Sequence, residues 1–304
     1  MHSRRRFLAS TLAASAALIA SRALGQLDTD RTMAMRAIPA TGEELPVIGM
    51  GTSGSFEVGT DAAARAPLLE VLQRFFAGGG RLIDTAPSYG PAEDVLGDLL
   101  TAGNHYPQTF MATKVSVVGR DAGLAQFQRS LERLQTDKVD LLQVHNLRDW
   151  KTQLALLREL KAEGKTRYIG LTHYLDSAHD ELADIVQAEK PDFLQINYSV
   201  VSRNVERRLL PLAQDLGVAV LINRAFEDGR LFREVTGTPV PEPLRETGVT
   251  TWAQAFLKFA LSHPAVTTVI PATGKPDRQS DNLKAGFGPD LDEAQRRALI
   301  AVFA

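Results

Sequence analysis

Residues 82–90 read Leu-Ile-Asp-Thr-Ala-Pro-Ser-Tyr-Gly, a short apolar run that ends in a carboxylate and is followed by a tyrosine and a glycine. In a strand–helix unit this order places Asp84 at the carboxyl end of the strand and Tyr89 in the loop that follows it. Side chains at these two places carry the chemistry of α/β barrels. The stretch therefore indicates an α/β fold with a functional site at one end of its strands.

Strand-like and helix-like segments alternate along the rest of the chain. Apolar residues at helical spacing over residues 68–76 predict an amphipathic helix, which the three glycines at 78–80 end. Pro91 is expected in the first turn of the next helix. Two short segments around Pro39-Ala40-Thr41-Gly42 predict a hairpin before the first strand. The predicted strands are residues 47–51, 82–84, 110–114, 139–145, 167–170, 193–197, 218–222 and 267–271.

Eight strands with helices between them predict a (β/α)8 TIM barrel with an N-terminal β-hairpin, a fold of about 250 residues. A doubly wound open sheet would usually carry a Gly-x-Gly-x-x-Gly turn after its first strand. Residues 49–54 read Gly-Met-Gly-Thr-Ser-Gly, which has the wrong spacing and no helix directly after it. We expect a single barrel domain over residues 26–304, with residues 227–248 as a long loop of one unit.

The first 25 residues have a different pattern. Ser3-Arg4-Arg5-Arg6-Phe7-Leu8 precedes an apolar run over residues 8–20 and small residues up to Gly25. The run is shorter than the about 20 residues of a membrane span, so no stable membrane insertion is expected. The pattern resembles a twin-arginine export signal, which implies a bacterial export machinery as partner, cleavage near Gly25 and a periplasmic location. A basic unstructured start and a general secretory signal are the alternatives.

Composition narrows the possible functions. The sequence has 304 residues and no cysteine, which excludes disulfides, zinc–thiolate sites and thiol nucleophiles, and we predict no metal site. The net charge is −2, and loss of the four arginines of residues 1–25, which contain no acid, would make it −6. A mildly acidic protein is not expected to bind nucleic acid or an anionic membrane.

Three consecutive predicted strands end in groups suited to acid chemistry. Asp84 closes one strand and precedes Tyr89, Lys114 closes the next, and His145 closes the third. Neighbouring strands lie about 4.8 Å apart, so these groups could converge. Each alone has an ordinary structural explanation, as a helix cap, a rim charge or a structural histidine.

Together these groups suit the reduction of a carbonyl. A nearby lysine lowers the pKa of a tyrosine, so Tyr89 could give a proton to the carbonyl oxygen. Asp84 would hold Lys114, and His145 would donate to the substrate oxygen or position it. The hydride must come from a cofactor, because no side chain can supply one.

This combination resembles the aldo-keto reductase family over about residues 40–285. The resemblance implies a (β/α)8 barrel, small carbonyl substrates and a nicotinamide cofactor, with NADPH favoured over NADH. The catalytic tetrad of the family corresponds to Asp84, Tyr89, Lys114 and His145.

The resemblance extends to a cofactor segment. Residues 270–282 read Ile-Pro-Ala-Thr-Gly-Lys-Pro-Asp-Arg-Gln-Ser-Asp-Asn and resemble the segment that binds the adenosine phosphate. By position, Thr273 and Arg278 would bind the 2′-phosphate, and Asp281 and Asn282 the adenine. An arginine fork and a helix start both favour a phosphate. Gln195 matches the residue that bonds the nicotinamide carboxamide.

The sequence departs from the family at the nicotinamide end. Thr172 and His173 stand where the family usually has Ser-Asn, and Asn223 stands where a tyrosine usually stacks on the nicotinamide. Arg224 beside it could contact the pyrophosphate, bind an acidic substrate or pair with a rim carboxylate.

Three functions follow from this sequence. NADPH-dependent reduction of an aldehyde or ketone is the leading one. The altered nicotinamide pocket and the export pattern also suit an exported nucleotide-binding sensor or regulatory module. The third is a redox-neutral conversion of a sugar by an enzyme that retains its cofactor.

Overall fold

The structure is a computed structural model that describes residues 32–304. The export signal predicted for residues 1–25 lies outside the described residues. Residues from Met33 to Ala304 form one compact unit.

The core of this unit is an eight-stranded parallel sheet with strand order β10-β9-β8-β7-β6-β5-β4-β3. Parallel backbone bridges join Ile48 to Val269 and Gly51 to Ala272, so the first strand meets the last and the sheet is nearly closed. This is the predicted (β/α)8 barrel. The strands are β3 (Met50–Gly51), β4 (Leu82–Asp84), β5 (Phe110–Val115), β6 (Val139–His145), β7 (Thr166–Thr172), β8 (Phe193–Asn197), β9 (Ala219–Asn223) and β10 (Val266–Val269).

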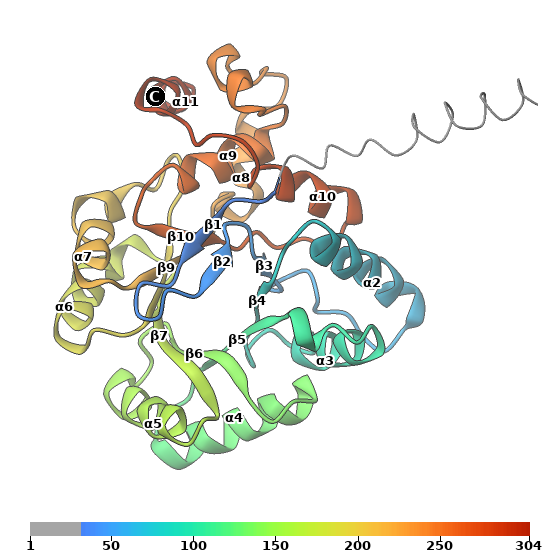
Figure 1. Ribbon diagram of the computed structural model, residues 1–304, viewed down its shortest axis with the longest axis vertical. Helices are drawn as coiled ribbons and strands as arrows, with labels where there is room; N and C mark the ends of the chain where they lie inside the picture. The colour runs from blue at the N-terminus through green and yellow to red at the C-terminus, as the bar shows by residue number, and fades with distance from the viewer. Residues whose placement is uncertain (1–31) are drawn as a thin grey trace, which may run out of the picture. The chain divides into compact units, whose positions relative to one another are not determined.

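Helices surround the barrel, as Figure 1 shows. Their inward stripes of buried apolar side chains join the core; α2, for example, buries Leu68, Val71, Leu72 and Phe75 as the sequence pattern predicts. The helices are α2 (Ala62–Ala77), α3 (Ala92–Ala102), α4 (Arg120–Leu134), α5 (Trp150–Ala162), α6 (His179–Glu189), α7 (Leu209–Leu216), α8 (Arg230–Glu234), α9 (Trp252–Leu261), α10 (Pro276–Lys284) and α11 (Glu293–Ala301).

The predicted hairpin is present as β1 (Met35–Ala37) and β2 (Glu44–Pro46), an antiparallel pair that lies across the barrel in Figure 1. Its Ile38 and Leu45 are fully buried in a cluster with Leu82 and Phe110, the first residues of β4 and β5. The hairpin therefore closes the end of the barrel at which the strands begin.

Three sequence-based expectations need correction. The first strand is two residues long rather than five, because only Met50 and Gly51 pair with β4. Pro91 caps α3 instead of entering its first turn. The loop predicted over residues 227–248 contains the short helix α8 and two 3-10 turns, which are too short to give a periodic apolar pattern.

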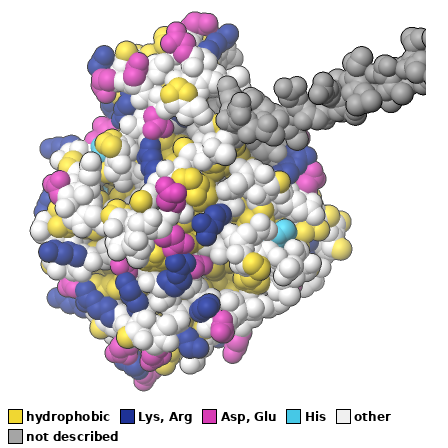
Figure 2. All heavy atoms as spheres, in the orientation of Figure 1, with side chains coloured by type: hydrophobic (Ala, Val, Ile, Leu, Met, Phe, Trp, Pro, Cys, Tyr) yellow, Lys and Arg dark blue, Asp and Glu magenta, His cyan; other side chains and the backbone are white. Residues whose placement is uncertain are grey.

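The surface carries both signs of charge. Figure 2 shows basic and acidic side chains interspersed on the face it displays. Within residues 32–304, no helix is long and apolar enough to cross a bilayer.

Gln279 in α10 gives a test of the packing. Its side chain is fully buried, and neither amide atom has a hydrogen-bond partner among the described residues. A buried unpaired polar group costs about 1–3 kcal/mol. We expect Gln279→Leu to raise the free energy of unfolding by about 1 kcal/mol and the melting temperature by about 2 °C, measured by urea titration and calorimetry.

Gln254 is the matched control, because its buried amide is fully used: it donates to Asp281 and accepts from Thr250. Gln254→Leu should destabilise the protein. Equal losses for both variants would contradict the assignment of Gln279 as an unpaired group.

Candidate active site

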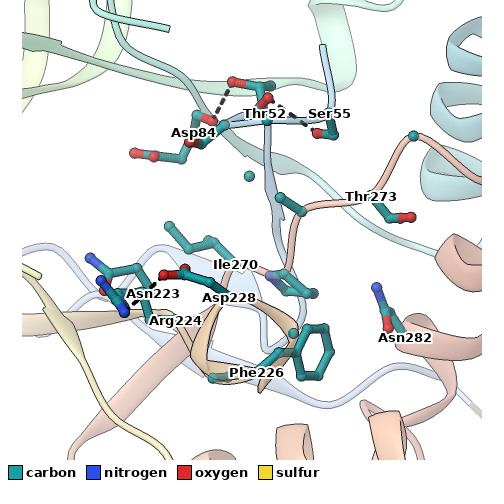
Figure 3. Close-up of a pocket in the computed structure, with 18 of the residues that line it drawn as sticks. Thr52, Ser55, Asp84, Asn223, Arg224, Phe226, Asp228, Ile270, Thr273 and Asn282 are labelled. Atoms are coloured by element: carbon teal, nitrogen blue, oxygen red, sulfur yellow. Dashed lines mark hydrogen bonds and ion pairs between the residues drawn. The ribbon is translucent and has the colours of Figure 1, made fainter. Parts of the chain in front are cut away.

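A cleft of about 1450 Å³ lies where the barrel strands end. Figure 3 shows Asp84 on one side of it and Asn223, Arg224 and Asp228 on another. The cleft is lined by the last residues of β3, β4, β6, β7 and β9. Of the predicted site residues, it takes in Asp84, Tyr89, His145, Thr172, Gln195, Asn223, Arg224, Thr273, Arg278, Asp281 and Asn282.

A buried ion pair forms the floor of the cleft. The Nζ of Lys114 lies 2.5 Å from Oδ2 of Asp84 and donates a second hydrogen bond to the backbone oxygen of Thr85, at 2.9 Å. The side chains of Lys114 and Asp84 are 0% and 3% exposed. Burial alone would lower the pKa of Lys114, but the charges of Asp84 and then Tyr89 outweigh it and raise that pKa. Lys114 is therefore charged at neutral pH.

The other oxygen of Asp84 accepts two side-chain amides. Oδ1 lies 3.0 Å from Nε2 of Gln143 and 2.8 Å from Nε2 of Gln195. The two glutamines are also joined, because Nε2 of Gln195 donates to Oε1 of Gln143 at 3.1 Å. Gln143 was missed in the sequence analysis, although it lies two residues before His145 on β6 and so shares its face of the strand.

Tyr89 lies above this ion pair. The Nζ of Lys114 is 5.1 Å from the centre of its ring, and the His145 ring meets it edge-on with the centroids 5.9 Å apart. Burial raises the pKa of Tyr89, and the charge of Lys114 lowers it, but by less. The expected effect of Lys114 is thus present, while the net shift is opposite to the one predicted. Tyr89 keeps its proton at neutral pH.

His145 is neutral over the physiological range. Burial, and next the positive charge of Lys114, lower its pKa to about 3. Its Nδ1 lies 3.4 Å from the hydroxyl oxygen of Ser88. A neutral imidazole carries one N–H, so His145 can donate one hydrogen bond to an oxygen without supplying a full charge.

His173 does not line the cleft, contrary to its predicted place. Its Nδ1 accepts the backbone N–H groups of Tyr174 and Leu175 at 3.1 and 3.2 Å, and its ring stacks on that of Tyr174. These local bonds turn the imidazole toward its own loop, a competition between side chain and backbone that is typical of strand ends.

At the end of the cleft where the sequence predicts the nicotinamide, some of the side-chain amide atoms have hydrogen-bond partners and one does not. Oε1 of Gln195 accepts from Thr172 and from Nδ2 of Asn223, both at 3.3 Å. The Oδ1 of Asn223 is buried and has no partner among the described residues. Arg224 pairs with Asp228 at 2.8 Å and lies over the ring of Tyr174, so of its three predicted roles the rim ion pair is the one present.

The end of the cleft at the start of α10 carries positive charges that form no ion pair among the described residues. Lys275 and Arg278 are exposed at the start of α10, and within residues 32–304 neither forms an ion pair. Asp281 accepts hydrogen bonds from Thr251 and Gln254, at 2.7 and 2.6 Å. Two unpaired cations at a helix start fit a phosphate at this end of the cleft.

Comparisons with known proteins agree with this geometry. The family model described as "Aldo/keto reductase family" matches residues 47–301. The chain is 30% identical to "Aldo-keto reductase YhdN" of Bacillus subtilis, in a match that covers 67% of this chain and 65% of that relative. It is 28% identical to "NADH-specific methylglyoxal reductase" of Escherichia coli, over 72% of this chain and 76% of the relative.

A solved structure has the same fold. The aldo-keto reductase of Klebsiella pneumoniae in complex with NADPH superimposes with a TM-score of 0.73 at 25% identity, over 88% of this chain and 94% of that chain.

The neutrality of His145 predicts a pH dependence of stability. The unfolded chain takes up this proton near pH 6.5, but folded His145 does so only near pH 3. Between these values the unfolded state binds more protons, so the stabilising contribution is present above pH 6.5 and is lost as the pH falls. In urea unfolding from about pH 7.5 to about pH 4.5, His145→Gln should lose less free energy of unfolding than the wild type. Equal losses would show that His145 is not held neutral.

Proposed function

The chain belongs to the aldo/keto reductase family, whose members are NAD(P)H-dependent oxidoreductases that act on carbonyl groups, and we propose that it reduces an aldehyde or a ketone with NADPH. The observation that carries this proposal is the convergence of Asp84, Lys114, Tyr89 and His145 at one cleft. A floor ion pair below a protonated phenol, with a neutral imidazole beside it, is an arrangement for donating a proton to oxygen.

A nicotinamide cofactor, when bound, would supply the hydride for the carbonyl carbon. The neutral His145 holds the carbonyl oxygen by a hydrogen bond, and Tyr89 gives that oxygen its proton. The raised pKa of Tyr89, which follows from burial, keeps the phenol protonated before the reaction. Lys114 then stabilises the phenolate, because its charge lies within reach of the ring and is held by Asp84.

The cofactor would lie along the cleft between the two ends described above. Asn223, Gln195 and Thr172, which line the cleft, would hold the nicotinamide, and Arg224 would lie near the pyrophosphate. Thr273, Lys275 and Arg278 would bind the 2′-phosphate, and Asp281 and Asn282 the adenine. Two unpaired cations favour NADPH over NADH, although one relative is named as NADH-specific.

The substrate would be a small carbonyl compound. Relatives are named methylglyoxal reductase in Escherichia coli and glyoxal reductase in Bacillus subtilis, which makes α-dicarbonyl compounds the first to test.

We also propose that residues 1–25 are a twin-arginine export signal, removed near Gly25, which delivers the barrel domain of residues 26–304 to the periplasm. Replacing Arg4 and Arg5 by lysine should retain the protein in the cytoplasm of a bacterial host, as seen by cell fractionation. Export of that variant at the wild-type level would reject the twin-arginine assignment.

A second candidate is an exported nucleotide-binding sensor of the same fold. It is favoured by Asn223 in place of a stacking ring and by Arg224, which is paired with Asp228. Purified protein that retains nucleotide but turns over no carbonyl would favour this candidate. Isomerisation of a sugar without net consumption of NADPH would instead indicate the redox-neutral enzyme.

Replacement of the acid tests the leading function. Tyr89→Phe removes only the hydroxyl, so methylglyoxal reduction followed at 340 nm should fall by about 100-fold or more, the usual contribution of a general acid. NADPH binding, followed by fluorescence, should change little. Full turnover by the variant would exclude Tyr89 as the proton donor.

Replacement of Arg278 tests the cofactor. A bond from arginine to phosphate contributes about 1.5–3 kcal/mol, so Arg278→Ala should weaken NADPH binding by about tenfold or more and NADH binding little. Arg74 is the matched control, because it is an arginine on α2 that contacts Asp277 and Glu70 and does not line the cleft. If Arg74→Ala weakened NADPH binding equally, the effect would be one of general surface charge.

A further inference from the structure

Gln143 is a polar side chain in the interior of the barrel that has no contact with the cleft. It is fully buried on β6 and is not among the cleft-lining residues. A buried amide is stable only where its hydrogen bonds are made. Both polar atoms of this amide form hydrogen bonds beside the ion pair. Nε2 donates to Oδ1 of Asp84 at 3.0 Å, and Oε1 accepts from Nε2 of Gln195 at 3.1 Å.

The neighbouring strand makes room for this side chain. Gly170 of β7 is the register partner of Gln143, and a Cβ atom at position 170 would lie 3.1 Å from Cγ of Gln143 and 3.0 Å from the backbone oxygen of Phe193 on β8. Both contacts are tighter than ordinary packing, so the glycine allows the glutamine to lie against β7 and reach Gln195 on β8. Gln195 on β8 thus reaches Asp84 on β4 both directly and through Gln143.

The two oxygens of Asp84 have different partners, and this asymmetry fixes the carboxylate. Oδ2 receives Lys114, and Oδ1 receives the two amides. Without the amide of Gln143, the carboxylate could rotate about its Cβ–Cγ bond at a smaller cost, and the Nζ of Lys114 would follow it.

We propose that Gln143 is a positioning residue, whose amide holds the Asp84 carboxylate in the orientation that keeps Lys114 against Tyr89. This role rests on the proposed reduction, for which Lys114 stabilises the phenolate. Gln143 touches neither substrate nor cofactor; it acts through Asp84 and, by its bond to Gln195, on one of the proposed nicotinamide ligands. The readouts that identify its effect on Asp84 are turnover and the ionisation of Tyr89.

The charged and titratable groups that face Tyr89 set the expected direction. Lys114 lowers the pKa of Tyr89, whereas burial, Asp84 and Glu57 raise it; His145, at its edge, is neutral. If Lys114 were displaced, burial and the acidic groups would still raise the pKa of Tyr89, and the charge that lowers it would be farther away. The pH above which Tyr89 loses its proton should then move upward.

The test compares the same substitution at two buried glutamines. Gln143→Met keeps the side-chain volume and removes the amide. Gln153→Met is the control, because Gln153 is fully buried in α5 and donates only to the backbone oxygens of Val117 and Gly119. For Q143M we expect kcat to fall about tenfold, with the KM for the carbonyl substrate within about threefold of wild type. The alkaline limb of the kcat profile should move to higher pH by about one unit.

Crystal structures of both variants give a readout that needs no turnover. In Q143M the Asp84 carboxylate should be rotated and its contact with Lys114 lengthened; in Q153M both should match the wild type. An unchanged Asp84–Lys114 contact and an unchanged pH profile in Q143M would overturn the proposal. If Q143M does not fold, Gln143→Leu removes the same amide and leaves an apolar side chain, and the same loss of kcat and the same pH shift are expected.

The outcomes separate this inference from the proposed function. A wild-type protein that binds no NADPH and reduces no carbonyl would reject the proposed function. The two crystal structures would still decide whether Gln143 holds Asp84.

Discussion

The buried contact between Lys114 and Asp84 is the constraint on which the rest of the site depends. Two opposite charges inside a protein are tolerated only when each is paired and further hydrogen-bonded. Here the lysine has Asp84 and the Thr85 carbonyl, and the aspartate has the lysine and two amides. The side chains of this cluster come from four strands, β4, β5, β6 and β8, so its full set of hydrogen bonds requires that these strands be in place.

The sequence was sufficient to predict those parts of the site whose position follows from the order of the strands. Asp84, Lys114 and His145 each end or nearly end a short buried strand, and parallel strands bring their ends together; the barrel and the convergence of these side chains could therefore be predicted. The net pKa shift of Tyr89 could not, because it depends on how deeply neighbouring loops bury the ring. Nor could the turned imidazole of His173, which is decided by two backbone N–H groups of its own loop.

The family is supported by nearly the whole barrel, whereas the proposed reaction depends on the few residues that line the cleft. The matched segment, residues 47–301, covers nearly the whole described barrel, and the tetrad lies within it. The residues that differ from the pattern of the resemblance lie around the expected position of the nicotinamide. They are Thr172, Asn223 and Arg224. Asp84, Tyr89, Lys114 and His145 thus follow the pattern of the resemblance, whereas the expected nicotinamide position is surrounded by Thr172, Asn223 and Arg224.

The hairpin β1–β2 has a kinetic consequence. Because Ile38 and Leu45 seal the amino end of the barrel, the cleft at the strand ends is the route by which molecules reach Tyr89. A dinucleotide laid along that cleft would occupy its floor, and a carbonyl compound would then arrive on top of it. Because both ligands would use this one entrance, the dinucleotide would have to bind before the carbonyl compound and leave after it.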